Sequence, residues 1–301
     1  MKHLISIADL SRDDVERILD AAEALSAPRV KLPTLRGKLV LTLFFESSTR
    51  TASSFELAAR RLSADVLSFK ASGSSVDKGE SLKDTVLTLA QYDPDAIVVR
   101  HPRIGAPELV AQHTEAAVVN AGDGKYRHPT QALLDLYTMR ETLGRLDGLH
   151  VAIVGDVLHS RVARSLVQAL DLVGARTTLV GPPTLLPRGI EALGCETSTD
   201  IRAIEDADVV YVLRMQRERM ESAYVPTLRE YTARWGITPE RLRPGQKVMH
   251  PGPINRGVEL DPRVADGPGS LVLDQVRAGL AVRMAVLQEL LVARPVLEVV
   301  A

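Results

Sequence analysis

The chain has 301 residues, of which 45% are hydrophobic and 25% charged, and its formal net charge is −1. This is globular composition with enough chain for about two domains, and the balanced charge argues against a nucleic-acid partner. The single cysteine, Cys195, excludes an internal disulfide framework and a cysteine-rich metal site, and it fits a reducing compartment. The sequence has no apolar run typical of a signal peptide or a membrane span, so we expect a cytoplasmic protein without a membrane partner.

The first half of the chain alternates apolar runs with helical patterns, after a capped helical pattern that begins at Ser11. Strands are predicted over residues 38–45, 65–69, 96–100 and 117–121. Helices are predicted over residues 51–62, 81–92, 107–113 and 129–143. This order predicts a parallel sheet with helices on both faces.

The alternation starts again after residue 148. Strands are predicted over residues 150–155, 177–181, 208–213 and 246–249. Helices are predicted over residues 160–172, 187–193, 226–235 and, at the end, 273–291. The predicted fold class is therefore α/β, with two doubly wound parallel-sheet domains, whose ligands bind beyond the carboxyl ends of the strands.

The turn after the first predicted strand is the most informative segment. Residues 45–51 read Phe-Glu-Ser-Ser-Thr-Arg-Thr and lead into a predicted helix. The N-terminus of a helix attracts anions, the hydroxyls of Ser48, Thr49 and Thr51 can donate, and Arg50 adds a forked cation suited to phosphate. The alternative is a residue that only caps the helix, but a cap needs one hydroxyl.

Other polar residues lie at the ends of further predicted strands in the first half. Arg100 ends the third strand, where a solvated rim is the alternative. His128 precedes Pro129 at a predicted helix start, which favours a neutral imidazole that donates a hydrogen bond. Gln131 lies one turn along the same helix and strengthens the functional interpretation of His128 over a structural one.

The second half of the chain has a corresponding set of polar residues at the ends of its predicted strands. The turn before Arg161 lacks the G-x-G-x-x-G pattern, which argues against a nicotinamide enzyme, and we interpret Arg161 as a carboxylate binder. Arg214 and Gln216 leave a predicted strand, with a solvated loop as the alternative. The loop His250-Pro-Gly-Pro253 is fixed by prolines and presents carbonyls that can accept from an amide, unless it is a simple turn.

No Walker A pattern, metal-spaced histidine cluster or nucleophile elbow is present, so we predict no metal and no cofactor. The gathered arginines, hydroxyls and histidine favour a small substrate with several negative charges. Catalysis would then come from positioning and electrostatic stabilisation.

These motifs occur in an order that resembles the aspartate carbamoyltransferases over essentially the whole chain. They are Ser48-Thr-Arg-Thr51, His128-Pro-Thr-Gln131, Arg161, Arg214-x-Gln216 and His250-Pro-Gly-Pro253. The first motif is shared with ornithine carbamoyltransferases. Those enzymes, however, resemble His-Cys-Leu-Pro at position 250 and carry a Ser-Met-Gly loop that this chain lacks.

The resemblance implies transfer of the carbamoyl group of carbamoyl phosphate to L-aspartate, a step of pyrimidine biosynthesis. It implies a carbamoyl phosphate-binding domain over residues 1–143, with the C-terminal helix of about 275–301 packed back on it, and an aspartate-binding domain over 144–274. It also implies that carbamoyl phosphate binds first and that the domains then close over aspartate.

The resemblance further implies residue roles. The catalytic residues would be Arg50, Thr51, Lys78, Arg100 and His128. Carbamoyl phosphate would contact Ser48, Thr49, Arg50, Thr51, Ser74, Arg100, His128, Gln131, Pro251, Gly252 and Pro253. Aspartate would contact Lys78, Arg161, Arg214, Gln216 and Gly252.

Ser74 and Lys78 lie in a polar loop that this family lends to a neighbouring subunit, which implies a homotrimer with shared sites. Regulatory chains or a dihydroorotase are possible partners.

The chain departs from its family at Lys125-Tyr126-Arg127, which we expect to add positive charge beside His128. The alternatives are a carbamoyltransferase for ornithine or a related amine, and a non-catalytic scaffold member of the fold.

Overall fold

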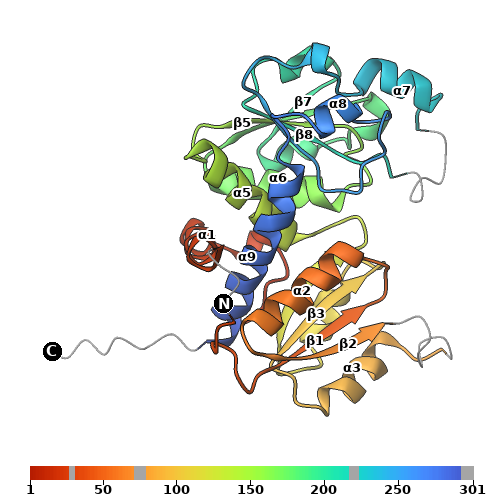
Figure 1. Ribbon diagram of the computed structural model, residues 1–301. Coiled ribbons are helices and arrows are strands. Elements are labelled where there is room, and N and C mark those ends of the chain that lie inside the picture. Colours follow the sequence, from red (N-terminus) through yellow and green to blue (C-terminus); the bar gives the residue numbers. More distant parts are fainter. Residues whose placement is uncertain (27–30, 71–78, 217–223, 293–301) are drawn as a thin grey trace.

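The computed structural model describes residues 1–26, 31–70, 79–216 and 224–292. The described chain forms two α/β domains, one above the other in Figure 1, each built around a parallel sheet. The prediction of two doubly wound parallel-sheet domains is confirmed. None of the described helices has the length and apolarity needed to cross a membrane.

The first sheet has the order β2-β1-β3-β4, and all of its pairs are parallel. Its strands are β1 (Leu39–Phe44), β2 (Asp65–Lys70), β3 (Ala96–His101) and β4 (Ala117–Asp123). The helices of this half are α1 (Arg12–Ser26), α2 (Thr49–Arg61), α3 (Leu82–Ala90), α4 (Ala106–Ala111) and α5 (Pro129–Leu143).

Both faces of the first sheet are covered, because neighbouring residues of a strand point to opposite sides. Val40 and Val98 belong to the large core under α1, α2 and α5, whereas Leu41 and Ile97 belong to the core under α3 and α4. This double burial explains why the inner strands read as continuous apolar runs.

The second sheet has the order β7-β6-β5-β8-β9 and is also parallel. Its strands are β5 (His150–Val154), β6 (Arg176–Val180), β7 (Glu196–Ser198), β8 (Val209–Val212) and β9 (Lys247–Met249). Its helices are α6 (Arg161–Leu172), α7 (Leu228–Trp235) and α8 (Pro262–Ala265).

Short 3-10 helices cover Ile7–Asp9, Pro183–Leu185, Ile190–Leu193, Ile201–Ile204 and Pro239–Arg241. The predicted helix over residues 187–193 is wrong. Gly189 and Gly194, with φ of +75° and +85°, bound a single 3-10 turn there. Strand β7 was not predicted, because its three residues are too few to show a strand pattern.

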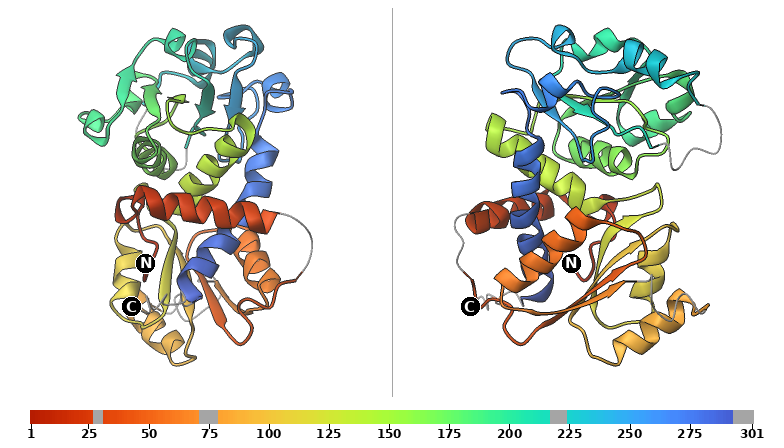
Figure 2. Two further views of the ribbon diagram at one scale, coloured as in Figure 1. Left: turned by 90° about the vertical axis from the view of Figure 1, so that its left-hand side faces the viewer. Right: turned by 45° about the vertical axis from the view of Figure 1, so that its right-hand side comes forward.

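The last helix, α9 (Val272–Leu291), begins beside the second sheet and packs against α1, α2 and α5. Figure 2 shows α9 in blue crossing α1 in red. One apolar core contains residues of α5 and α9 together with Ile153 and Leu166 of the second domain. The two domains are therefore joined by packed side chains, and α9 supports both sides of their junction.

Candidate active site

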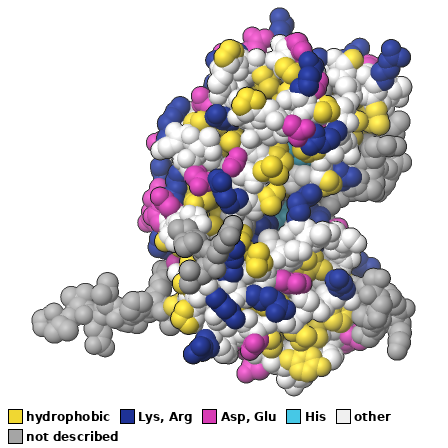
Figure 3. All heavy atoms as spheres, viewed as in Figure 1, with side chains coloured by type: hydrophobic (Ala, Val, Ile, Leu, Met, Phe, Trp, Pro, Cys, Tyr) yellow, Lys and Arg dark blue, Asp and Glu magenta, His cyan; other side chains and the backbone are white. Residues whose placement is uncertain are grey.

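The carboxyl ends of the two sheets meet at the domain junction. In the first domain, β1 leads into Glu46 and Arg50, and Arg100 is the penultimate residue of β3. In the second domain, β5 leads to Arg161 and β9 leads to His250. Figure 3 shows the surface indented between the domains, with lysine or arginine and histidine side chains gathered there.

The start of α2 is not closed by its own cap. Ser48 is the N-cap residue, yet its side chain makes no capping hydrogen bond. At α6, by contrast, the hydroxyl of Ser160 accepts from the N–H of Ala163 at 3.2 Å. Since the first helical N–H groups have no partner within a helix, the Ser48 end of α2 keeps donors for an anion. The interpretation of this serine as a simple cap therefore does not describe the turn.

Arg50 extends from α2 to the second domain. Gly252 has φ of +64°, and a Cβ built on it would lie 2.9 Å from Cζ of Arg50. A side chain at position 252 would therefore meet the guanidinium. Partial desolvation and the nearby charge of Arg214 lower the pKa of Arg50. No carboxylate among the described residues lies within ion-pair distance of Arg50, so an anion between the two arginines would be stabilised.

Glu46 is a site residue that the sequence analysis missed. Its Oε2 accepts from Nε of Arg100 at 3.1 Å and from Nη2 of Arg161 at 2.6 Å. One carboxylate thus holds an arginine from each domain. The signal was available, because Glu46 is the acidic residue between the first strand and the Ser-Ser-Thr-Arg turn.

Arg161 is 4% exposed and lies against Gly122. Gly122 has φ of +123°, and a Cβ there would lie 3.0 Å from Nη1 of Arg161. Gly122 lies near the end of β4, and the absence of a side chain there allows an arginine of the other domain to approach the backbone closely. Nη1 of Arg161 is buried and has no hydrogen-bond partner among the described residues.

His128 is the N-cap residue of α5 and is 4% exposed. Its N–H donates to Oγ of Ser165 on α6 at 2.9 Å, which ties the start of α5 to the second domain. Neighbouring Arg127 is buried and pairs with Asp123 at 2.8 Å and Glu108 at 2.5 Å. The expected positive charge beside His128 is therefore reduced to the exposed Lys125, because two carboxylates neutralise Arg127.

Gln131 lies one turn into α5, where Nε2 donates to Oδ1 of Asp135 at 3.0 Å. With Nε2 engaged, Oε1 of Gln131 is left to accept from a ligand.

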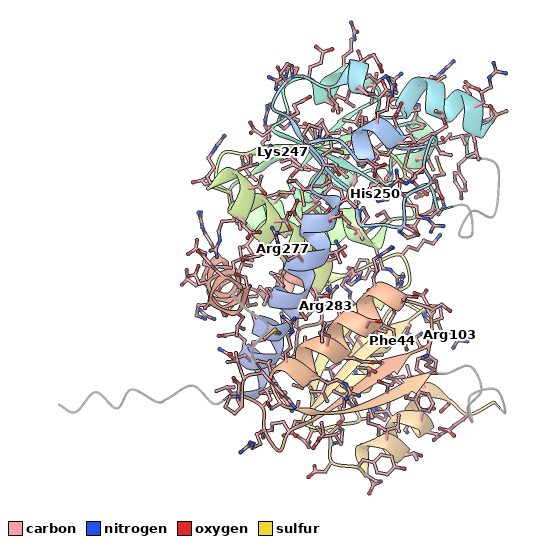
Figure 4. The ribbon with its side chains drawn as sticks, viewed as in Figure 1. Phe44, Arg103, Lys247, His250, Arg277 and Arg283 are labelled. Carbon is pink, nitrogen blue, oxygen red and sulfur yellow. The ribbon has the colours of Figure 1, made fainter. Side chains whose placement is uncertain are left out.

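His250 and the loop after it come from the second domain (Figure 4). The N–H of His250 donates to Oε1 of Gln275 at 2.9 Å, and Nδ1 of His250 accepts from the N–H of Gly252 at 2.8 Å.

The imidazole of His250 is fully buried, with Nε2 3.3 Å from the carboxylate of Glu259. Burial lowers its pKa, and the charges of Arg50 and Arg214 lower it further, while Glu259 opposes them. A neutral ring can accept the N–H of Gly252 at Nδ1. This contact helps to hold Pro251, Gly252 and Pro253 in one conformation.

Arg214 and Gln216 follow β8 and are half-buried. The N–H of Gln216 donates to Oδ2 of Asp156 at 3.1 Å, and Asn255 donates to the carbonyl of Met215 at 3.2 Å. Asp156 is another residue that sequence analysis missed, because it was considered only as part of a dinucleotide turn. Its Oδ1 lies 2.8 Å from Nδ1 of His159, so it ties the start of α6 to the segment after β8.

The structure thus brings together Arg50, Arg214 and Gly252, joins Arg100 to Arg161 through Glu46, and connects Gln131 to His250 through Asp135 and Gln275. Ser74 and Lys78 lie outside the described residues. Within those residues, no group of three or more His, Cys, Asp or Glu side chains is placed to hold a metal ion.

Two doubly wound domains with arginines gathered at their junction are typical of a protein that binds small anions. Residues 2–141 match the carbamoyl phosphate-binding domain of aspartate/ornithine carbamoyltransferases, and residues 147–290 match the aspartate/ornithine-binding domain. The chain belongs to the aspartate/ornithine carbamoyltransferase family, which confirms the resemblance inferred from its motifs.

A curated relative is the aspartate carbamoyltransferase catalytic subunit of Parafrankia sp., which is 57% identical over 97% of each chain. The fold is similar to that of aspartate transcarbamoylase from Trypanosoma cruzi in complex with N-(phosphonacetyl)-L-aspartic acid, with a TM-score of 0.89, 34% identity and 96% of each chain covered. A second structure of that protein, in complex with carbamoyl phosphate and aspartate, matches with a TM-score of 0.88, 34% identity, and 96% and 97% coverage.

Proposed function

We propose that the chain transfers the carbamoyl group of carbamoyl phosphate to the amine of L-aspartate, giving N-carbamoyl-L-aspartate and phosphate for pyrimidine biosynthesis. The observation that carries the proposal is the position of Arg50, which reaches from the first domain to Gly252 of the second, near Arg214. The relatives named aspartate carbamoyltransferase, and the Trypanosoma cruzi structure with both substrates, support this reaction.

The phosphate of carbamoyl phosphate would bind at the start of α2. Ser48, Thr49, Arg50 and Thr51 supply hydroxyls, helical N–H groups and a guanidinium, and Arg100 supplies a second cation. The uncapped N-terminus of α2 supports this assignment. Oε1 of Gln131 and the carbonyls of Pro251, Gly252 and Pro253 would hold the carbamoyl amide, because its two N–H groups need acceptors.

The chemical step would be attack of the aspartate amine on the carbonyl carbon of carbamoyl phosphate. Negative charge then grows on the carbonyl oxygen until the bond to the phosphate oxygen breaks. The leaving phosphate takes the proton that the attacking amine loses. Thr51, Arg100 and His128 would stabilise this charge by donating to that oxygen, and Arg50 would stabilise the leaving phosphate. The chemistry needs no nucleophile from the protein, so rate enhancement would come from charge complementarity and positioning.

The two carboxylates of aspartate would bind to Arg161, Arg214 and Gln216. The buried Nη1 of Arg161, which has no partner among the described side chains, supports a ligand carboxylate there. These arginines disfavour ornithine, whose side chain carries a positive charge where aspartate carries a negative one.

We also propose a homotrimer in which Ser74 and Lys78 complete the site of a neighbouring subunit. The exposed outer edge of the first sheet supports such an assembly. The edge strand β2 carries Leu67, which is 38% exposed, and Leu57 of α2 is 45% exposed. A cytoplasmic location belongs to the same proposal, because a reducing compartment preserves the buried free thiol of Cys195.

The test is a parallel assay of carbamoylated product with L-aspartate, L-ornithine and putrescine as acceptors. We expect turnover with aspartate alone. Product with ornithine and none with aspartate would contradict the assignment of Arg161 and Arg214. To exclude a non-catalytic scaffold, N-(phosphonacetyl)-L-aspartic acid is titrated by calorimetry, and a scaffold would show no saturable binding.

A further inference from the structure

Asp135 is a fully buried carboxylate that accepts hydrogen bonds from three different elements. Oδ1 accepts from Nε2 of Gln131 on α5 at 3.0 Å and from Nε2 of Gln275 on α9 at 2.7 Å. Oδ2 accepts from the hydroxyl of Tyr211 on β8 at 2.8 Å. The carboxylate therefore connects the helix that carries Gln131 to the second sheet and to the C-terminal helix.

The hydrogen-bond chain continues to the proline loop. Oε1 of Gln275 accepts from the N–H of His250, and Nδ1 of His250 accepts from the N–H of Gly252. A continuous path thus runs from Gln131, through Asp135 and Gln275, to the loop at residues 250–253. Its two ends are the two groups to which the carbamoyl amide is assigned.

Asp135 also determines which way the two glutamine amides face. An ionised carboxylate only accepts hydrogen bonds, so Gln131 and Gln275 must both turn Nε2 toward it and Oε1 away from it. For Gln275, Oε1 then meets the N–H of His250. For Gln131, Oε1 is left for the N–H of a substrate amide.

A buried carboxylate at this junction is costly to the folded state. Burial raises the pKa of Asp135 to about 7, although its three hydrogen bonds and the charge of Arg283 oppose that rise. Arg283 lies on α9 with its guanidinium 5.2 Å from the ring of Phe55, and Nη1 donates to the carbonyl of Gly279 (Figure 4). A well-packed apolar side chain would avoid the desolvation cost, so the carboxylate is better explained by the geometry it imposes.

We propose that Asp135 is a positioning residue for the carbamoyl amide, which orients Gln131 directly and the Pro251–Pro253 carbonyls through Gln275 and His250. The inference rests on the proposed function. It predicts that loss of the carboxylate weakens recognition of the amide and leaves recognition of the phosphate intact. The reason is that no hydrogen bond given for the described residues joins the start of α2 to Asp135, Gln131 or Gln275.

The test compares two ligands by calorimetry on the purified chain at pH 8, above the pKa of about 7 at which Asp135 ionises. The ligands are phosphonoacetamide, which carries an amide, and inorganic phosphate, which does not. In Asp135→Asn the introduced amide can donate as well as accept, so Gln131 is no longer forced into one orientation. We expect affinity for phosphonoacetamide to fall about tenfold, which corresponds to one hydrogen bond, and affinity for phosphate to change less than about twofold. The KM for carbamoyl phosphate should rise in parallel.

Two further variants separate positioning from general destabilisation. Gln275→Met cuts the path between Asp135 and His250 but leaves Gln131 in place, and we expect a smaller loss for phosphonoacetamide only. Thr138→Ala removes another buried polar side chain of α5, whose hydroxyl donates to the carbonyl of Leu134, and should lower thermal stability without changing either affinity.

The inference would be overturned if Asp135→Asn and Gln275→Met lowered the affinity for both ligands equally, or if neither affinity changed. The proposed function would stand in both cases. Failure of the unaltered chain to bind phosphonoacetamide, or to form product from aspartate, would overturn the proposed function itself and the inference with it.

Discussion

Glu46 and Arg161 join the two domains at the candidate site, with Oε2 of Glu46 2.6 Å from Nη2 of Arg161. The same oxygen lies 3.1 Å from Nε of Arg100 in the first domain. A carboxylate shared in this way keeps two arginines in fixed directions without neutralising both. The contact also favours the arrangement in which the domains lie close together.

The first prediction follows from this contact. Glu46→Gln keeps the shape of the side chain but removes its charge, so the link between domains weakens. We expect kcat/KM for aspartate to fall by about one to two decades, mainly through KM, while affinity for inorganic phosphate stays nearly constant. Glu115→Gln is the matched control, because Glu115 is fully exposed and its ion pair is with Lys2, far in sequence from the candidate site residues. Unchanged aspartate kinetics in Glu46→Gln would contradict the role given to the link.

The second prediction concerns Arg50, which extends to Gly252 and which we assign to binding the phosphate of carbamoyl phosphate. Arg50→Ala removes a charge-assisted bond to the leaving group, and we expect kcat/KM to fall by at least about two decades. Arg60→Ala removes an exposed arginine from the last turn of the same helix and should have near-normal kinetics. Near-normal kinetics in Arg50→Ala as well would refute its role.

The third prediction is a pH dependence of stability caused by Asp135. Its pKa rises from 3.8 to about 7 on folding, so the native state retains a proton that the unfolded chain has lost between these values. The free energy of unfolding therefore decreases as pH rises through this window and is constant above it. Between pH 5 and pH 8 this one group should cost about 2 to 3 kcal/mol.

Urea unfolding of the unaltered chain and of Asp135→Asn at both pH values measures this effect, since the titration of His250 and of surface groups is common to both and cancels. We expect the free energy of unfolding of the variant, relative to that of the unaltered chain, to be higher at pH 8 than at pH 5. A difference that does not vary with pH would show that Asp135 has no raised pKa.

The fourth prediction tests the proposed sharing of sites between subunits. Lys78→Ala and His128→Ala should each be nearly inactive. In a trimer that mixes the two variants in a ratio of two to one, one site of three has a native His128 and a native Lys78 from its neighbour. Mixing with subunit exchange should therefore restore up to about a third of the activity. No recovery, after exchange has been verified by mass spectrometry, would exclude sharing.

The sequence alone determined the type and order of most elements, because they depend on local patterns. The helix predicted over residues 129–143 begins and ends as α5 does, since Pro129 suits a first turn and Gly144 adopts the left-handed conformation that ends a helix. The pattern failed where elements are short, as at β7 and the turn over Ile190–Leu193. The family motifs were equally local, so they identified the candidate residues by type.

Only the tertiary structure decided how those residues are held. The contact of Glu46 with Arg161 spans 115 positions, and the bond from Gln275 to Asp135 spans 140. No periodic pattern in the sequence indicates partners so far apart, because their approach depends on how two sheets and α9 pack. The neutralisation of Arg127 by Asp123 and Glu108 has the same origin, since burial forces a charge to find whichever partners the fold brings near it.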